Sequence, residues 1–208
     1  MKSLIPIDKL QIKNPIKLDS GEYIDSCEVA FKTYGTLNAK KTNAILVCHA
    51  LSGDQFCSEI NPLTKKLGWW NILIGPGKVI DTNIFFVICS NVLGGCMGST
   101  GPSSINPQTK TNYGLNFPVI TISDMVKVQE KLVSALGIKK LFAVIGGSMG
   151  GMQTLEWATK FSNKVNVAIP IATSYRHSAQ NIAFHEIGRQ AIMADPVWNK
   201  GNYYKTRK

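Results

Sequence analysis

No apolar run in this 208-residue sequence is long enough to cross a bilayer, since runs such as Ala44–Cys48 and Ile84–Cys89 have the length of a strand. The first residues, Met1–Pro6, lack the apolar core of a secretory signal. The five cysteines form no Cys-x-x-Cys pair and cannot all pair with one another. Cys48 and Cys89 lie in apolar runs, where a buried, reduced thiol is expected. These absences predict a cytoplasmic protein with no membrane partner and no metal site.

Arginine and acidic residues are also scarce. Arginine occurs only at positions 176, 189 and 207, so the net charge of +10 comes almost entirely from lysine. The lysines are spread along the chain, without a basic helix or a stripe of aromatic and arginine side chains that could stack on bases. No glycine-rich motif of the phosphate-cradling kind is present. Nucleic acid is therefore not expected as a partner, although the charge suits an anionic substrate such as one carrying phosphates.

Apolar runs rich in β-branched and aromatic residues predict five strands. They are Cys27–Tyr34, Ala44–Cys48, Ile84–Cys89, Leu141–Ile145 and Val165–Ala172. The last four do not alternate between apolar and polar residues, which is typical of strands buried on both faces of a mostly parallel sheet. A helix capped by Ser123 or Asp124 should precede Gly137, and a second should follow Ser148. Alternating strands and helices indicate an α/β fold with a mostly parallel sheet and flanking helices.

Two long, loop-rich stretches, 52–81 and 91–118, interrupt this pattern. Loops of this length in a compact domain are often functional, so we expect them to shape a pocket. The alternative is that their glycines form tight turns packed under the sheet edge. From about Ser178 the pattern changes, and Ile182–Ala194 is predicted as a helix that ends at Asp195-Pro196.

The most informative stretch is Val-Ile-Gly-Gly-Ser-Met-Gly-Gly at 144–151, which places Ser148 in a Gly-x-Ser-x-Gly pattern. It lies between a predicted strand and a predicted helix. A serine on so sharp a turn has a strained backbone, and the flanking glycines allow the chain to approach closely. The turn exposes the hydroxyl near the N–H groups that begin the helix. We therefore interpret Ser148 as a nucleophile; the alternative is a solvent-facing serine in a glycine-rich turn.

A nucleophilic serine also needs an oxyanion hole and a base. The candidate oxyanion donors are the backbone N–H groups of Leu51, in the loop after an earlier strand, and of Met149. In enzymes with this type of serine turn, an acidic residue and then a histidine follow the serine in the sequence. The histidines that follow Ser148 here are His177 and His185. Neither follows an acidic partner on a late loop, and His49 is better placed to form the pocket floor. We therefore expect a chain truncated at Lys208, with its catalytic Asp and His absent.

Six segments carry a resemblance to one enzyme family. They are NAILVCHALSG ending at Gly53, GWWNILIGPGKVID from Gly68, NVLGGCMGSTGP from Asn91, YGLNFP from Tyr113, AVIGGSMGGMQTLEW from Ala143 and SYRHSAQNIAFHEIGRQAIMADPVW from Ser174. Together they resemble homoserine O-acetyltransferases over nearly the whole chain. The segments around Cys96 and Ser148 are far more specific than a bare Gly-x-Ser-x-Gly.

The resemblance implies an α/β-hydrolase fold with a helical lid. Residues 1–177 would form an incomplete core without its last strands, and 178–208 the start of the lid. It implies a homodimer that transfers acetyl from acetyl-CoA, a co-substrate, to L-homoserine on the route to methionine, with no cofactor. Ser148 matches the family's nucleophile, and Leu51 and Met149 match its oxyanion donors. The family's catalytic Asp and His, and the arginine that holds the homoserine carboxylate, would lie beyond Lys208.

Several other functions remain open from the sequence. A homoserine O-succinyltransferase or a serine O-acyltransferase would use the same chemistry on a different donor or acceptor. A plain esterase or thioesterase would use the same serine turn, because the fold alone does not determine function. A non-enzymatic alternative is an inactive fragment with an exposed, aggregation-prone sheet edge.

Overall fold

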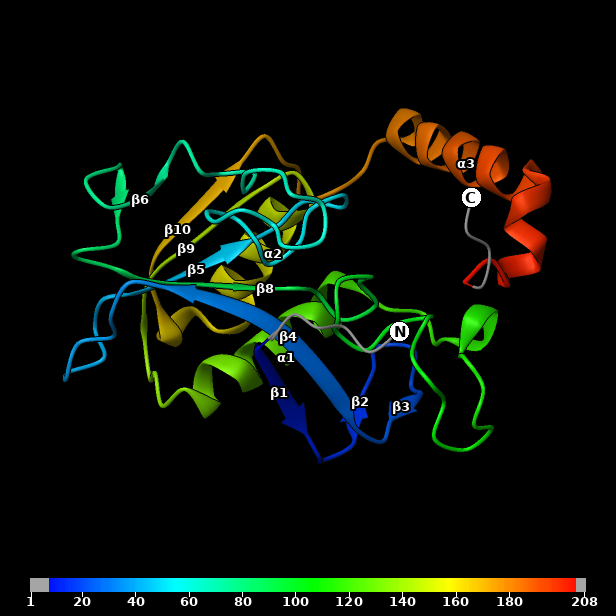
Figure 1. Cartoon of the computed structure of the whole chain (residues 1–208), viewed down its shortest axis with the longest axis horizontal. Coiled ribbons are helices and arrows are strands. Elements are labelled where there is room, and N and C mark those ends of the chain that lie inside the picture. Colours follow the sequence, from blue (N-terminus) through cyan, green and yellow to red (C-terminus); the bar gives the residue numbers. More distant parts are fainter. Residues whose placement is uncertain (1–7, 205–208) are drawn as a thin grey trace.

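The computed structural model describes residues 8–204, and its centre is a six-stranded sheet (Figure 1). The strand order is β1-β4-β8-β5-β9-β10, in which β8, β5, β9 and β10 run parallel while β4 is antiparallel to both of its neighbours. The strands are β1 (Asp8–Ile12), β4 (Cys27–Tyr34), β5 (Ala44–Cys48), β8 (Phe86–Ser90), β9 (Leu141–Gly147) and β10 (Val165–Ile171). The predicted α/β fold with a mostly parallel sheet is confirmed.

Two hydrophobic clusters cover the two faces of the sheet. Leu46 and Cys48 of β5 point into one cluster, which contains the apolar sides of α1 (Ile122–Ala135) and α2 (Met149–Lys160). Ile45 and Val47 point into the other. Every residue of β5 is buried, because successive side chains alternate between two covered faces.

The second cluster corrects the expectation for stretch 52–81. Its residues cover the sheet face opposite α1 and α2, where Cys57, Ile74 and Ile80 are buried beside Trp69 and Trp70. Two short parallel strands that the sequence did not indicate, β6 (Ile74–Gly75) and β7 (Ile80–Asp81), lie within it. The alternative, glycine turns packed under the sheet edge, does not describe it either, because apolar side chains of this stretch cover a face of the sheet.

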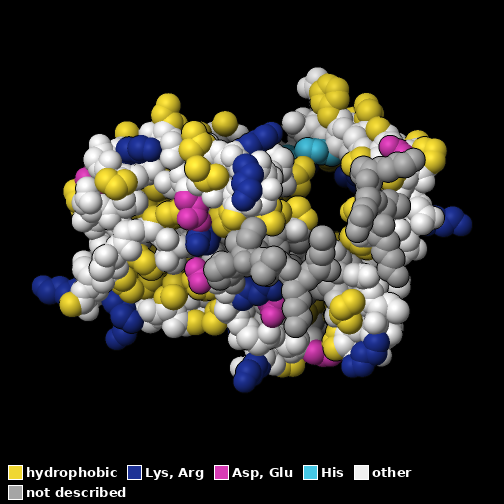
Figure 2. All heavy atoms as spheres, in the orientation of Figure 1, with side chains coloured by type: hydrophobic (Ala, Val, Ile, Leu, Met, Phe, Trp, Pro, Cys, Tyr) yellow, Lys and Arg dark blue, Asp and Glu magenta, His cyan; other side chains and the backbone are white. Residues whose placement is uncertain are grey.

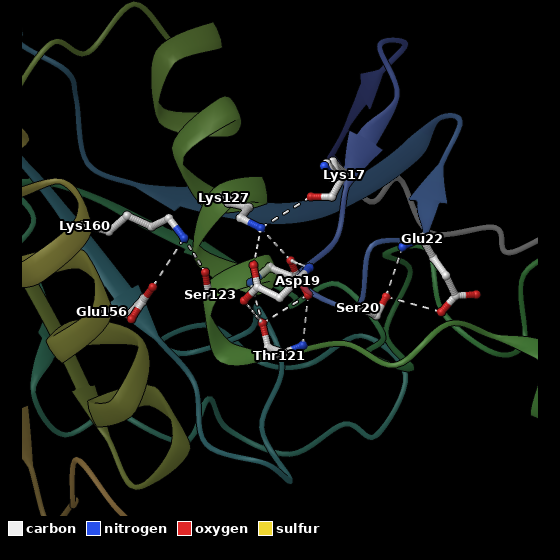
Figure 3. Close-up of polar contacts among 10 residues, drawn as sticks. Lys17, Asp19, Ser20, Glu22, Thr121, Ser123, Lys127, Glu156 and Lys160 are labelled. Carbon is white, nitrogen blue, oxygen red and sulfur yellow. Dashed lines mark hydrogen bonds and ion pairs between the residues drawn. The ribbon is translucent and has the colours of Figure 1, made fainter.

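The start of α1 also differs from the prediction. Its N-cap is Thr121, whose hydroxyl accepts a hydrogen bond from the Asp124 N–H, while the Asp124 carboxylate accepts one from the Thr121 N–H. This reciprocal capping box places Asp124 three residues inside the helix. The buried Asp124 carboxylate also contacts Lys127 and the N–H of Asp19, so the cap ties α1 to the N-terminal segment (Figure 3). That segment also contains the unpredicted strand β1 and the short pair β2 (Ile16–Lys17) and β3 (Tyr23–Ile24).

Beyond α2 the chain is more exposed. After the short turn η2 (Ser162–Lys164), β10 pairs only with β9 among the described strands, and none of its seven residues is buried. The expectation that β10 is covered on both faces is therefore wrong for residues 8–204.

α3 (Ala179–Ala194) stands away from the sheet (Figure 1), and η3 (Pro196–Gly201) contacts η1 (Gly114–Asn116). The helix begins three residues before the predicted start, because Ser178 caps it, and ends before Asp195-Pro196 as predicted. Apolar side chains on it are exposed (Figure 2), among them Ile182, Phe184, Ile187 and Ile192. None of the helices described is both long and apolar enough to pass through a membrane.

Candidate active site

Ser148 occupies the sharp turn between β9 and α2. Its backbone has φ 55° and ψ −122°, a conformation that costs a residue with a side chain about 1–3 kcal/mol. The turn is held at both ends, since the Ser148 N–H donates to the Ile171 carbonyl at 3.0 Å and the Thr173 hydroxyl donates to the Ser148 carbonyl at 2.8 Å. The side chain is exposed. A strained serine that is both fixed and accessible has the geometry of a nucleophile elbow.

Gly146 and Gly150 are required by the close approach of α2 to the sheet. A Cβ at Gly150 would lie 2.7 Å from the carbonyl carbon of Cys48, and one at Gly146 would lie 2.9 Å from the Cys48 oxygen. The end of β5 therefore lies directly against the start of α2. This contact brings the loop after β5 next to Ser148.

The two candidate oxyanion donors line one cleft. Leu51 and Met149 both contribute to a cavity of about 460 Å³, together with His49. Within residues 8–204, neither the Leu51 N–H nor the Met149 N–H has a hydrogen-bond acceptor, and Ser148 makes no side-chain cap to α2. Free N–H groups at a helix start and in a loop can stabilise the charge that develops on a carbonyl oxygen attacked by Ser148.

His49 controls the orientation of the Leu51 peptide. It is buried, its Nε2 accepts from the Val92 N–H at 3.1 Å, and its Nδ1 lies 2.7 Å from the Ala50 carbonyl oxygen. A backbone N–H can only donate, so the His49 proton is on Nδ1 and is donated to Ala50. Because the C=O and N–H of a trans peptide point in opposite directions, this bond turns the Leu51 N–H away from the ring. Burial lowers the pKa of His49, which favours this neutral form.

The stretch 91–118 forms another wall of the cleft, as expected. Its lining residues are mainly apolar or glycine, among them Leu93, Cys96, Leu115 and Phe117. Asn91 fixes the start of this stretch. Its side-chain oxygen accepts a hydrogen bond from the Met97 N–H at 3.0 Å, and its backbone carbonyl accepts one from Ser99 Oγ at 2.6 Å. Of stretch 52–81, only Gly53 reaches this cleft.

The two histidines after Ser148 are not brought to it. The rings of His177 and His185 stack on one another with centroids 5.1 Å apart, and neither has a hydrogen bond to Ser148 among the described residues. The described part of the chain also contains no group of three His, Cys, Asp or Glu side chains that could hold a metal. Cys48 and Cys89 are buried and reduced as predicted, and burial raises the pKa of Cys48 to about 12.

Sequence reasoning missed the buried amides behind the cleft, Asn91, Gln129 and Gln153. All three are at most 1% exposed. Gln129 and Gln153 lie on the inner sides of α1 and α2, at positions where apolar residues would be expected. A polar residue on the apolar face of a predicted helix is the signal that could have found them.

Comparison with known proteins agrees with this geometry. The family described as the alpha/beta hydrolase fold matches residues 43–207. The chain belongs to the α/β-hydrolase fold family. Its resemblance to homoserine O-acetyltransferases is also confirmed: the enzyme of that name from Mesorhizobium japonicum is 59% identical over 203 residues, covering 98% of this chain and 52% of the relative. The chain thus spans about half the length of the curated relatives that it matches.

Two solved structures have a similar fold over this part of the chain. Homoserine O-acetyltransferase from Bacillus anthracis superposes with a TM-score of 0.88 at 35% identity, over 96% of this chain and 55% of that one. Esterase E22 superposes with a TM-score of 0.86 at 38% identity, over 96% of this chain and 56% of that one. The neighbours therefore include both an acyltransferase and a hydrolase, and the choice between them depends on the acceptor.

Proposed function

We propose that the protein is a homoserine O-acetyltransferase that works through an acetyl ester on Ser148. The observation that carries the proposal is the strained, exposed Ser148 beside one cleft lined by Leu51 and Met149. The identity of 57–61% to curated proteins of that name supports the choice of reaction. The donor is acetyl-CoA, the acceptor is the γ-hydroxyl of L-homoserine, and no cofactor takes part.

In the first half-reaction the Ser148 hydroxyl attacks the thioester carbonyl of acetyl-CoA. A base takes the hydroxyl proton, and the resulting oxyanion accepts hydrogen bonds from the Leu51 and Met149 N–H groups. The carbon–sulfur bond then breaks, and CoA leaves as a thiol with the proton returned by the base. The neutral His49 has both ring nitrogens engaged, so it does not serve as this base.

In the second half-reaction the homoserine γ-hydroxyl attacks the acetyl-serine ester. The same base takes the proton of that hydroxyl and returns it to Ser148 Oγ as the ester bond breaks. Transfer must be faster than hydrolysis, so water has to be kept from the ester. The mainly apolar wall formed by stretch 91–118 favours this exclusion.

The remaining parts of the proposal concern the whole protein. We place the catalytic Asp and His, and the arginine for the homoserine carboxylate, in the half of the relatives that residues 1–208 do not match. We propose that the segment starting at Ser178 begins a helical lid over the cleft. We also propose that the protein is a homodimer and that it acts in the cytoplasm in methionine biosynthesis.

The test uses the product of the complete gene and measures CoA release from acetyl-CoA with and without L-homoserine. We expect continuous CoA release to depend on homoserine. When homoserine is omitted, each enzyme should release a single equivalent of CoA and gain one acetyl group on Ser148. Ser148→Ala should abolish both signals, and an acetylated Ser148→Ala protein would contradict the assignment. Succinyl-CoA and L-serine, each substituted for one substrate, test the donor and the acceptor.

An esterase is the second candidate, supported by the close superposition on esterase E22. Its signature is release of CoA, or of p-nitrophenol from p-nitrophenyl acetate, at a rate that homoserine does not change. That result would keep Ser148 as the nucleophile and would reject the transferase.

A further inference from the structure

One buried side chain contacts both halves of the candidate oxyanion hole. The Gln153 amide nitrogen lies 3.2 Å from the His49 carbonyl oxygen and 3.2 Å from the Met149 carbonyl oxygen. His49 begins the loop that contains Leu51, and Met149 begins α2. Gln153 itself is fully buried. Its two N–H groups therefore each have an acceptor, one on each side of the cleft.

A relay of hydrogen bonds sets the orientation of this amide. The indole of Trp157 can only donate, and it donates to Gln129 Oε1 at 2.9 Å. The Gln129 nitrogen must then be the end that donates to Gln153 Oε1, at 2.7 Å. This leaves the Gln153 nitrogen facing the two carbonyls. All three side chains are at most 1% exposed, so water does not compete for these bonds.

The relay connects three elements that are distant in sequence. Trp157 and Gln153 lie on α2, Gln129 lies on α1, and the His49 carbonyl follows β5. Trp157 is also part of the main hydrophobic cluster. The Gln153 amide is thus linked to the core at one end. At the other end it holds the carbonyls of the His49–Ala50 and Met149–Gly150 peptides, and each of these is next to a peptide that carries a candidate oxyanion donor.

We infer that Gln153 is a positioning residue that fixes the spacing of the Leu51 and Met149 N–H groups. This inference rests on the proposed function, because it assigns Gln153 to the same oxyanion hole. Without the amide, the β5–α2 contact through Gly150 would remain. The His49 and Met149 carbonyls would lose their shared donor, and the adjacent peptides that carry the Leu51 and Met149 N–H groups could then turn independently. Donors that turn away from the oxyanion lose part of their effect on the transition state and little of their effect on the bound substrate.

The test is Gln153→Met in the complete gene product, because methionine is similar in length and donates no hydrogen bond. We expect kcat for acetyl transfer to fall about 10- to 100-fold, less than the 10²- to 10³-fold typical of deleting an oxyanion donor. The KM for acetyl-CoA should stay within about twofold. The rate at which a fluorophosphonate labels Ser148 should fall in parallel with kcat, because that reaction also places an oxygen in the hole.

Thr154→Val is the matched control. Thr154 is the next residue of α2, it is equally buried, and its hydroxyl also donates to a carbonyl four residues earlier, that of Gly150. Its hydroxyl makes no hydrogen bond to the loop after β5 in the described structure. We expect a comparable loss of thermal stability and an unchanged kcat.

The outcomes separate the two proposals. If the wild-type enzyme neither transfers acetyl nor reacts with the fluorophosphonate, the proposed function fails. If the wild type is active and Gln153→Met keeps its kcat, or loses no more than Thr154→Val, the role of Gln153 is wrong. If Gln153→Met does not fold, Gln129→Leu replaces it, since loss of the relay frees the Gln153 amide to turn; an unchanged kcat in that variant would also reject the inference.

Discussion

The strands β5 and β10 are alike in their apolar character but have very different surroundings. Both are short apolar segments rich in β-branched residues, yet every residue of β5 is buried and no residue of β10 is. The helices in the two regions differ in the same way, because α2 has a buried side and α3 has none. β5 and α2 are thus packed within the hydrophobic core, whereas β10 is paired along β9 and stays partly exposed, and α3 buries none of its residues.

This difference shows that an apolar pattern predicts the type of an element but not what covers it. β5 lies between β8 and β9 with a hydrophobic cluster on each face. Among the described strands β10 pairs only with β9, and α2 also contacts it. Three pairs of matched substitutions, one member in each region, test the comparison, and all are measured on the complete gene product.

The largest difference is expected between two helical glycines. Gly150→Ala forces a methyl group against the carbonyl of Cys48 and should cost more than about 4 kcal/mol, so that little folded protein is recovered. A methyl group at Gly188 of α3 would have no neighbouring atom within 4 Å, so Gly188→Ala should raise local helix stability by about 1 kcal/mol. Yield and urea unfolding measure the first effect, and amide exchange in α3 measures the second. If Gly150→Ala gave the same yield and the same free energy of unfolding as Gly188→Ala, the difference between the two regions would be contradicted.

A smaller difference is expected between two valines in different parts of the sheet. Val47 of β5 is fully buried and Val167 of β10 is 45% exposed. Val47→Ala should lower the free energy of unfolding by about 2 kcal/mol, because it removes two methyl groups from a packed cluster. Val167→Ala should cost less than about 1 kcal/mol. Urea unfolding followed by circular dichroism gives both values, and a larger loss at Val167 would show that β10 is covered in the whole protein.

The smallest difference is expected in how two carboxylates, Asp19 and Glu186, change the stability of the protein at acid pH. Hydrogen bonds from Lys127 and then Thr121 lower the pKa of Asp19 to about 2, and they join segments more than 100 residues apart (Figure 3). Hydrogen bonds from Gln190 and Arg189 lower the pKa of Glu186, but within one helix.

Because the folded-state pKa of Asp19 is below its ordinary value of 3.8, its stabilisation is complete above that value and is lost as the pH falls towards 2. Asp19→Asn should remove this part of the acid sensitivity, an effect below about 1 kcal/mol because the pair is partly exposed. Glu186→Gln should leave the unfolding curve unchanged at every pH. Thermal unfolding from pH 6 to pH 2 checks both variants, and a larger change at Glu186 would show that α3 unfolds together with the core.

Much of the fold could be predicted because its signals are local. β4, β5 and the Asp195 end of α3 were located to the residue by apolar runs and a proline. The capping residue of α1 was misplaced, because the choice between Thr121 and Ser123 depends on Asp124 reaching back within the turn and on Asp19 from the N-terminal segment. β6, β7 and the packing of 52–81 were missed, since two-residue strands have no periodicity.

The candidate site also has features that the sequence indicated and features that depend on tertiary contacts. The sequence by itself determined the sharp turn at Ser148, because the glycines at 146 and 150 let α2 begin directly against the end of β5. It also indicated that the loop after β5 supplies the second N–H. Only the tertiary structure decided that His49 accepts from the Val92 N–H and contacts the Ala50 carbonyl, and that Gln153 contacts the His49 and Met149 carbonyls. The bonds from the Val92 N–H to His49 and from Gln153 to the His49 carbonyl join residues 43 and 104 positions apart. Hydrogen bonds between buried polar groups at such separations leave no periodic trace in the chain.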